Sequence, residues 1–104
     1  MPATAYANRT TSGQVANGTG AGGRLVVLLG DNSVFDGARV VIKYTVGAVN
    51  ATLGRAPGEG ELSDSCLGHG AKRWMDVLAP DGVGWSVDVL NAGASTNLNL
   101  IVVT

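Results

Sequence analysis

The stretch Ala38-Arg-Val-Val-Ile-Lys-Tyr-Thr-Val46 decides the fold class, because apolar and polar residues alternate along it. Side chains alternate between the two faces of a β-strand, so this period of two predicts a strand with one buried face. The face predicted to be buried carries Val40, Ile42, Tyr44 and Val46.

Several other segments have the same short β-type pattern. Residues 25–29 are a continuous apolar run between glycines, whereas residues 84–90 and 96–104 alternate. Weaker patterns cover residues 49–53 and 73–78. Five to seven short strands, with no amphipathic helix between them, predict an all-β fold, either an antiparallel β-sandwich or a small jelly-roll-like barrel.

The tetrapeptide Ala79-Pro-Asp-Gly82 predicts a tight turn, since proline presets φ and glycine tolerates positive φ. The turn lies between two predicted strands, so a hairpin is expected there. Trp74 and Trp85 would then face each other across it, as a core or cross-strand pair rather than as a platform for a sugar.

Residues 1–23 differ in composition from the remainder of the chain, being mostly Ala, Thr, Ser, Asn and Gly. This composition predicts an extended N-terminal arm that is flexible or ordered by a partner, followed by a β-sandwich domain over residues 24–104. Tyr6 and Val15 are the residues of the arm able to anchor it, and together with Arg9 they are its predicted partner contacts.

Composition excludes several classes of partner. The chain has 104 residues, a formal net charge of -1 and only 14% charged residues. Its seven Lys and Arg residues are scattered, so no basic block is present to neutralise the phosphates of a nucleic acid. No secretory signal or apolar membrane span is visible, and a single cysteine allows no internal disulfide.

Two motifs suggest chemistry that their context does not favour. Gly18-Thr-Gly-Ala-Gly-Gly23 matches the letters of a dinucleotide-binding loop but precedes a predicted strand, so a linker is the better interpretation. Cys66 and His69 would need two further ligands to hold a metal, and the glycines around His69 favour a turn.

Two groups of oxygen-bearing side chains are also better explained without a functional site. The spacing of the first does not fit a calcium-binding loop. The second would need a glycosidase cleft with aromatic walls, which the sequence does not indicate. The sequence therefore predicts a protein that is not an enzyme and has no catalytic residues, cofactor or metal. The two groups considered are Asp31, Asn32, Ser33 and Asp36, and Glu59, Glu61 and Asp64.

Two segments, Phe35-Asp-Gly-Ala-Arg-Val-Val-Ile-Lys-Tyr44 and Gly84-Trp-Ser-Val-Asp-Val-Leu-Asn-Ala-Gly-Ala-Ser-Thr-Asn-Leu-Asn-Leu100, resemble small β-rich virion proteins of tailed bacteriophages. These are capsid decoration (cement) proteins and head or tail fibre modules. The resemblance covers residues 23–104 and rests on the style of strands and turns.

The resemblance implies a structural virion protein that catalyses nothing. We expect a decoration protein at the capsid surface that is assembled in the host cytoplasm. Its expected partners are the major capsid protein or other virion subunits. It is also expected to be a homo-oligomer, with a trimer favoured. The alternative is a fibre or tail module that recognises a host surface ligand through loops at residues 55–61 and 66–70. Neither function involves nucleic acid or a membrane.

Overall fold

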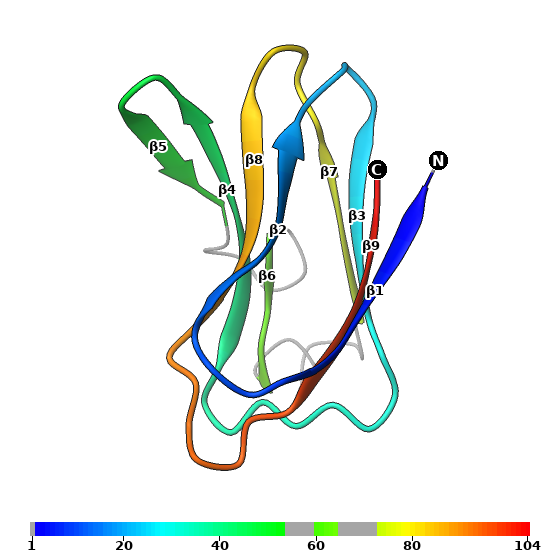
Figure 1. The fold of residues 1–104 in the computed structure, drawn as a ribbon, viewed down its shortest axis with the longest axis vertical. Helices are drawn as coiled ribbons and strands as arrows, with labels where there is room; N and C mark the ends of the chain where they lie inside the picture. Colours follow the sequence, from blue (N-terminus) through cyan, green and yellow to red (C-terminus); the bar gives the residue numbers. More distant parts are fainter. Residues whose placement is uncertain (1, 54–59, 65–72) are drawn as a thin grey trace.

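The computed structural model describes residues 2–53, 60–64 and 73–104. Within these ranges the chain forms nine β-strands (Figure 1). The strands are β1 (Ala3–Arg9), β2 (Gly13–Thr19), β3 (Arg24–Leu29), β4 (Arg39–Val46), β5 (Val49–Thr52), β6 (Glu61–Leu62), β7 (Trp74–Leu78), β8 (Gly84–Leu90) and β9 (Leu98–Val103).

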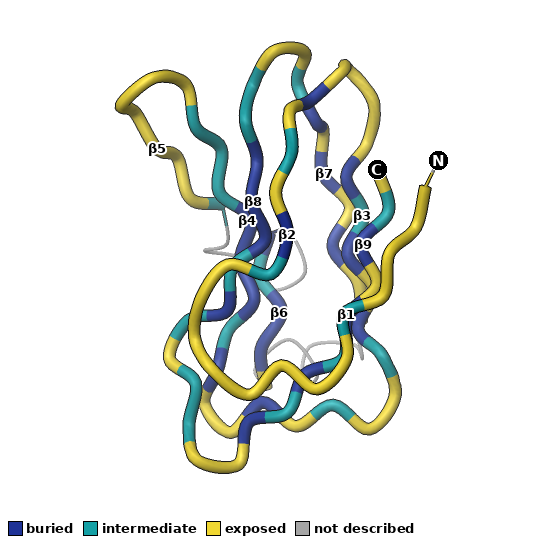
Figure 2. Tube along the Cα trace, in the orientation of Figure 1, coloured by how far each residue is buried: buried dark blue, intermediate teal, exposed yellow. Residues whose placement is uncertain are grey.

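The strands form two antiparallel sheets packed face to face. Sheet A has the order β1-β9-β3-β7, and sheet B has the order β2-β8-β4-β5, with β6 pairing β4 beside β5. The predicted all-β antiparallel sandwich is thus confirmed. The faces that the two sheets turn toward each other hold most of the buried residues (Figure 2).

The core is made by every second residue of the central strands, as the alternating sequence predicted. Val40 and Ile42 are buried as expected, while Val46 lies beyond the core and is exposed. The main buried side chains are Leu25, Val27, Leu29, Met75, Val77, Leu98, Leu100 and Val102 in sheet A and Val40, Ile42, Trp85, Val87 and Val89 in sheet B.

The predicted boundary between an arm and a domain at residue 23 is wrong. Residues 3–9 form β1, which pairs with β9 at the edge of sheet A, and residues 13–19 form β2, which pairs with β8 at the edge of sheet B. The segment is extended as predicted, but its own chain orders it. Edge strands are held largely by backbone hydrogen bonds, so small polar residues can form them without an apolar pattern.

The predicted hairpin across residues 79–82 is also wrong. β7 lies in sheet A and β8 in sheet B, so the connection passes from one sheet to the other. Trp74 therefore faces outward from sheet A with 46% of its surface exposed, while Trp85 points into the core. The residues of the turn specify that the chain reverses direction. Whether the strands on either side of the turn pair with each other depends on which sheet each strand joins.

Candidate functional site

An apolar row crosses the outer face of sheet A from one edge to the other. Register places Trp74 opposite Leu28, Leu28 opposite Ile101, and Ile101 opposite Ala5, one residue from each of the four strands. Leu28 is 36% exposed and Ile101 is 37% exposed. Large apolar side chains aligned on a solvent-facing sheet are a recognised mark of an interaction surface.

Polar groups border this row at both ends of the strands. At one end the Arg24 Nε lies 2.9 Å from Asp76 Oδ1, so the two charges neutralise each other. At the other end the Asn8 backbone N–H donates to Asn99 Oδ1 at 3.0 Å. An apolar centre with a polar margin is the usual anatomy of a protein contact surface.

The outer face of sheet B is built differently. Register places Val41 between Asp88 and Glu61, and its side chain is buried although it points away from the core. Lys43 lies 3.8 Å from Asp88, and Arg39 lies 3.9 Å from Glu61. Charged side chains thus flank the apolar group on this face, as long amphipathic stems commonly do.

A second apolar patch lies at the tip of the β4–β5 hairpin, here called the hairpin tip and made of Val46, Gly47, Ala48 and Val49. Val46 is 61% exposed and Val49 is 72% exposed. The hairpin stands at the margin of sheet B, away from the apolar row (Figure 1). The apolar row and the hairpin tip are thus two separate apolar surfaces within the part of the chain that the structure describes.

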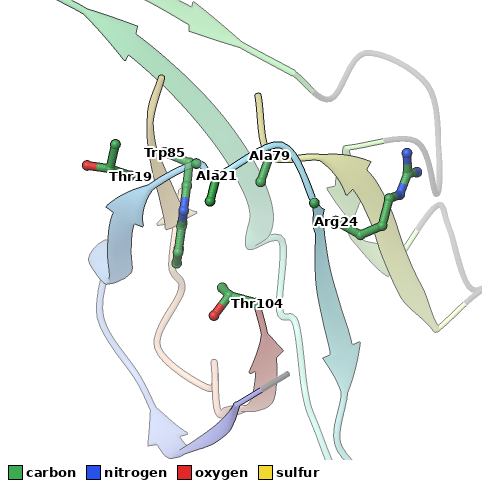
Figure 3. Close-up of a pocket in the computed structure, with 8 residues that line it drawn as sticks. Thr19, Ala21, Arg24, Ala79, Trp85 and Thr104 are labelled. Carbon is green, nitrogen blue, oxygen red and sulfur yellow. The ribbon is translucent and has the colours of Figure 1, made fainter. Parts of the chain in front are cut away.

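A cavity of about 420 Å³ opens at one end of the sandwich, where the two sheets separate (Figure 3). Small residues of the β2–β3 connection and of the segment after β7 leave this space unfilled. The Arg24 side chain points away from Trp85 in Figure 3 and bonds Asp76 instead. Apolar groups dominate the lining, which includes Thr19, Ala21, Arg24, Ala79, Trp85 and Thr104.

Tyr44 lies near this end of the sandwich, and its pKa is shifted from the usual value. Register pairs it with Trp85, and its hydroxyl donates to the backbone carbonyl of Leu78. Burial raises the pKa of Tyr44 above 10.0, and the positive charge of Arg24 partly offsets that rise. Tyr44 ties sheet B to the end of β7, and we assign it a structural role.

Tyr44 makes alkaline stability a test of this contact. The folded state keeps the phenol proton to higher pH than the unfolded state, so the free energy of unfolding should fall as pH rises from about 10 toward the raised folded pKa. Urea denaturation of the protein and of Tyr44→Phe between pH 8 and 11 isolates this effect. The difference in free energy of unfolding between the protein and Tyr44→Phe should narrow above about pH 10. A difference that stays constant with pH would contradict the assignment.

The three residues predicted to contact a partner, Tyr6, Arg9 and Val15, make contacts within the protein itself. Tyr6 and Val15 are half-buried and pack against the core from β1 and β2. The Arg9 guanidinium lies over the Tyr6 ring, 5.3 Å from its centroid, in a cation–π contact. Tyr6 and Val15 thus anchor their own strands, and a contact of these three residues with another subunit stays a prediction.

The oxygen-rich segment after β3 closes the other end of the sandwich. The Ser33 hydroxyl donates to the Gly30 carbonyl at 2.8 Å, and the Asp36 carboxylate accepts the Ser95 N–H at 2.8 Å. These bonds engage Ser33 and Asp36, two of the four residues considered for a calcium loop. Gly93 packs so closely on Asp36 that an added Cβ would lie 2.5 Å from the carboxylate.

Chemistry-bearing residues do not gather in the described part of the chain. No group of three or more His, Cys, Asp or Glu there could hold a metal ion. Glu61 pairs with Arg39, and Asp64 is exposed. Cys66, His69 and Glu59 lie outside the described residues, as do most of the two loops expected to recognise a ligand.

No family model, curated protein or solved structure matches this chain. Residues 2–53, 60–64 and 73–104 contain no helix that is long and apolar enough to cross a membrane. Function must therefore be argued from the surfaces described above. The sequence did contain a signal for the apolar row: residues 25–29 and 100–103 are apolar at every position, which makes both faces of their strands apolar.

Proposed function

We propose that the protein is a structural virion protein that decorates and stabilises an assembled phage head. The observation that carries the proposal is the pair of separate apolar patches, the apolar row on sheet A and the hairpin tip. A subunit with two such patches can contact two neighbours at once. A protein that binds its partner through a single site needs only one apolar patch.

The composition of the surface supports attachment to protein rather than to a charged polymer. The four salt bridges among the described residues pair opposite charges, and the formal net charge is -1. Many small apolar contacts repeated over a symmetric shell add up through multivalency, even where each contact is weak. Such a subunit needs a stable scaffold and exposed apolar side chains, and a reaction centre is unnecessary.

A second candidate function, a fibre or tail module that recognises a host surface ligand, is favoured by the cavity beside Trp85. Its volume of about 420 Å³ falls within the range of small-molecule sites. Trp85 itself is 8% exposed, so its ring offers little platform for a sugar. The decoration role rests on the more exposed surfaces and is preferred.

Copy number in purified particles separates the two roles. Quantitative mass spectrometry of the virus that encodes the chain should count on the order of hundreds of copies per particle for a decoration protein, because each shell repeats its sites many times. Purified protein added to heads that lack it should bind to saturation and raise the temperature at which they release DNA. A few copies per particle, with no binding to heads, would assign the protein to the tail.

Substitutions at the hairpin tip test which surface meets the shell. Val46→Ser combined with Val49→Ser removes both exposed valine side chains and should weaken binding to heads at least about tenfold, since apolar burial is lost at each of many sites. Val34→Ser is the matched control, because Val34 is also exposed but lies outside both patches. Equal binding by the two variants would show that the hairpin tip does not contact the shell.

A further inference from the structure

The outer face of sheet A is self-complementary, and we propose that it packs against the same face of a second copy about a two-fold axis that runs along the strands. This inference depends on the fold and the register of sheet A. It does not require the proposed role in a virion.

The apolar row has its largest side chain at one edge of the sheet and its smallest at the other. The row runs from the indole of Trp74 on β7, through Leu28 on β3 and Ile101 on β9, to the methyl group of Ala5 on β1. The centre of the row lies between β3 and β9, which are the two inner strands. Side chains therefore project far from the sheet at the β7 edge and only a short distance at the β1 edge.

A two-fold axis along the strands exchanges these two edges. Two sheets stacked face to face about an axis between β3 and β9 place Trp74 of one copy over Ala5 of the other, and Leu28 over Ile101. Each large side chain meets a small one, and the two branched residues meet each other. Opposed large and small residues are how packed layers interdigitate, and an isologous interface requires this match of a patch with itself.

The neighbouring row obeys the same rule. Register places Asp76, Val26, Val103 and Ala3 in order across the four strands. The same axis brings Val26 opposite Val103 of the other copy, and Asp76 opposite Ala3. Asp76 keeps its bond to Arg24 at the margin, so no carboxylate is left without its partner.

Charge favours a second copy as the occupant of this face. A partner of opposite charge would need unpaired charge to recognise. Among the described residues, the ionic groups at the borders of the face are paired, Arg24 with Asp76 and Arg73 with Asp31 at 3.5 Å. A face that is neutral and apolar suits another neutral and apolar face. The size match described above is specific to a copy of itself.

The area of the face sets the strength of the pair. Four strands about 4.8 Å apart and about five residues long cover roughly 300 Å² per copy. This is below the roughly 800 Å² that each partner buries in a standard interface, so the pair is a weak one. We expect monomers at about 10 µM and dimers at about 1 mM, or wherever the chain is concentrated.

Sedimentation equilibrium of the whole chain from 10 µM to 1 mM tests the pairing. The weight-average mass should rise toward twice the mass of the chain over this range. Leu28→Arg places a charge at the centre of the face and should weaken the dimer at least about tenfold. Val49→Arg, an equal change at an exposed position on β5 of sheet B, should leave the mass curve unchanged. A wild-type chain that stays monomeric at 1 mM would overturn the proposal.

An exchange of large and small residues tests the two-fold geometry. Ala5→Trp alone should weaken the dimer because two indoles collide, and Trp74→Ala alone should weaken it because a gap remains. The double variant Ala5→Trp/Trp74→Ala restores one large residue opposite one small residue and should recover the dimer to within about threefold of wild type. Far-UV circular dichroism checks that each variant is folded. A folded double variant no tighter than either single variant would exclude this axis.

A cross-link gives a second and independent readout. In a Cys66→Ser background, a short bismaleimide should cross-link chains carrying Leu28→Cys to chains carrying Ile101→Cys, because the axis places these positions opposite each other and stacked sheets lie about 10 Å apart. Mixing Leu28→Cys with Val49→Cys, which lies on sheet B, should give no comparable product. Dimerisation and binding to heads are separate measurements, so failure of either leaves the other to be judged alone.

Discussion

Deleting residues 1–22 is expected to abolish cooperative folding of the whole domain. The deletion removes β1 from sheet A and β2 from sheet B, together with the partly buried Tyr6 and the buried Ala16. Each strand forms several backbone hydrogen bonds, and each bond contributes about 1 kcal/mol net. The combined loss is comparable with the roughly 5–15 kcal/mol by which a domain of this kind is stable.

Chemical denaturation measures this effect directly. Urea titration followed by the fluorescence of the buried Trp85 should give a cooperative transition for the full chain and none for the truncated chain. A synthetic peptide of residues 1–22 added in trans should restore the transition, because both edges are open to strand addition. A truncated chain that unfolds at the same urea concentration as the full chain would return these residues to the status of a dispensable arm.

The same deletion cannot test which surface makes the proposed contact with a head. A truncated chain that fails to bind has lost its fold as well as any contact made by its first residues. Substitutions of exposed residues, such as Val46 and Val49 at the hairpin tip, leave the strand pairing intact and are the appropriate test.

Alternation was sufficient to predict the central strands and their buried faces. Ile42, Val87 and Leu100 lie in the core because their strands carry apolar residues at every second position. β1 and β2 have no such signal, since Ala, Asn, Gly and Thr at a sheet edge are held by backbone bonds that any residue can make. Composition therefore predicted an arm where two strands are present.

The candidate contact surfaces depend on long-range pairing, which the sequence does not reveal. Trp74 is exposed because β7 joins sheet A, whereas the local turn after it predicted a partner in β8. The apolar row appears only when four strands distant in the chain are set in register. A run that is apolar on both faces indicates that both faces are covered, but it does not indicate what covers them.

Gly20→Ala is expected to destabilise the protein by about 3 kcal/mol or more, although the segment that contains it was predicted to be a flexible linker. Gly20 is buried, and an added Cβ would lie 2.1 Å from the carbonyl oxygen of Pro80. The obstacle is backbone, so no side chain can rotate away. Gly20 also donates its N–H to Val83 at 2.8 Å and accepts the Gly82 N–H at 3.0 Å, which fixes the two connections against each other.

Gly23→Ala is the matched control, because it adds the same methyl group to the same connection. No atom lies within 4 Å of the Cβ position at Gly23, and its φ is not positive. The control should be neutral or stabilising by about 0.5 kcal/mol, since alanine restricts the unfolded chain. Urea midpoints of the two variants measure the difference. Equal midpoints would mean that residues 20 and 80 are not in contact and that the connection between β2 and β3 is as free as its composition suggests.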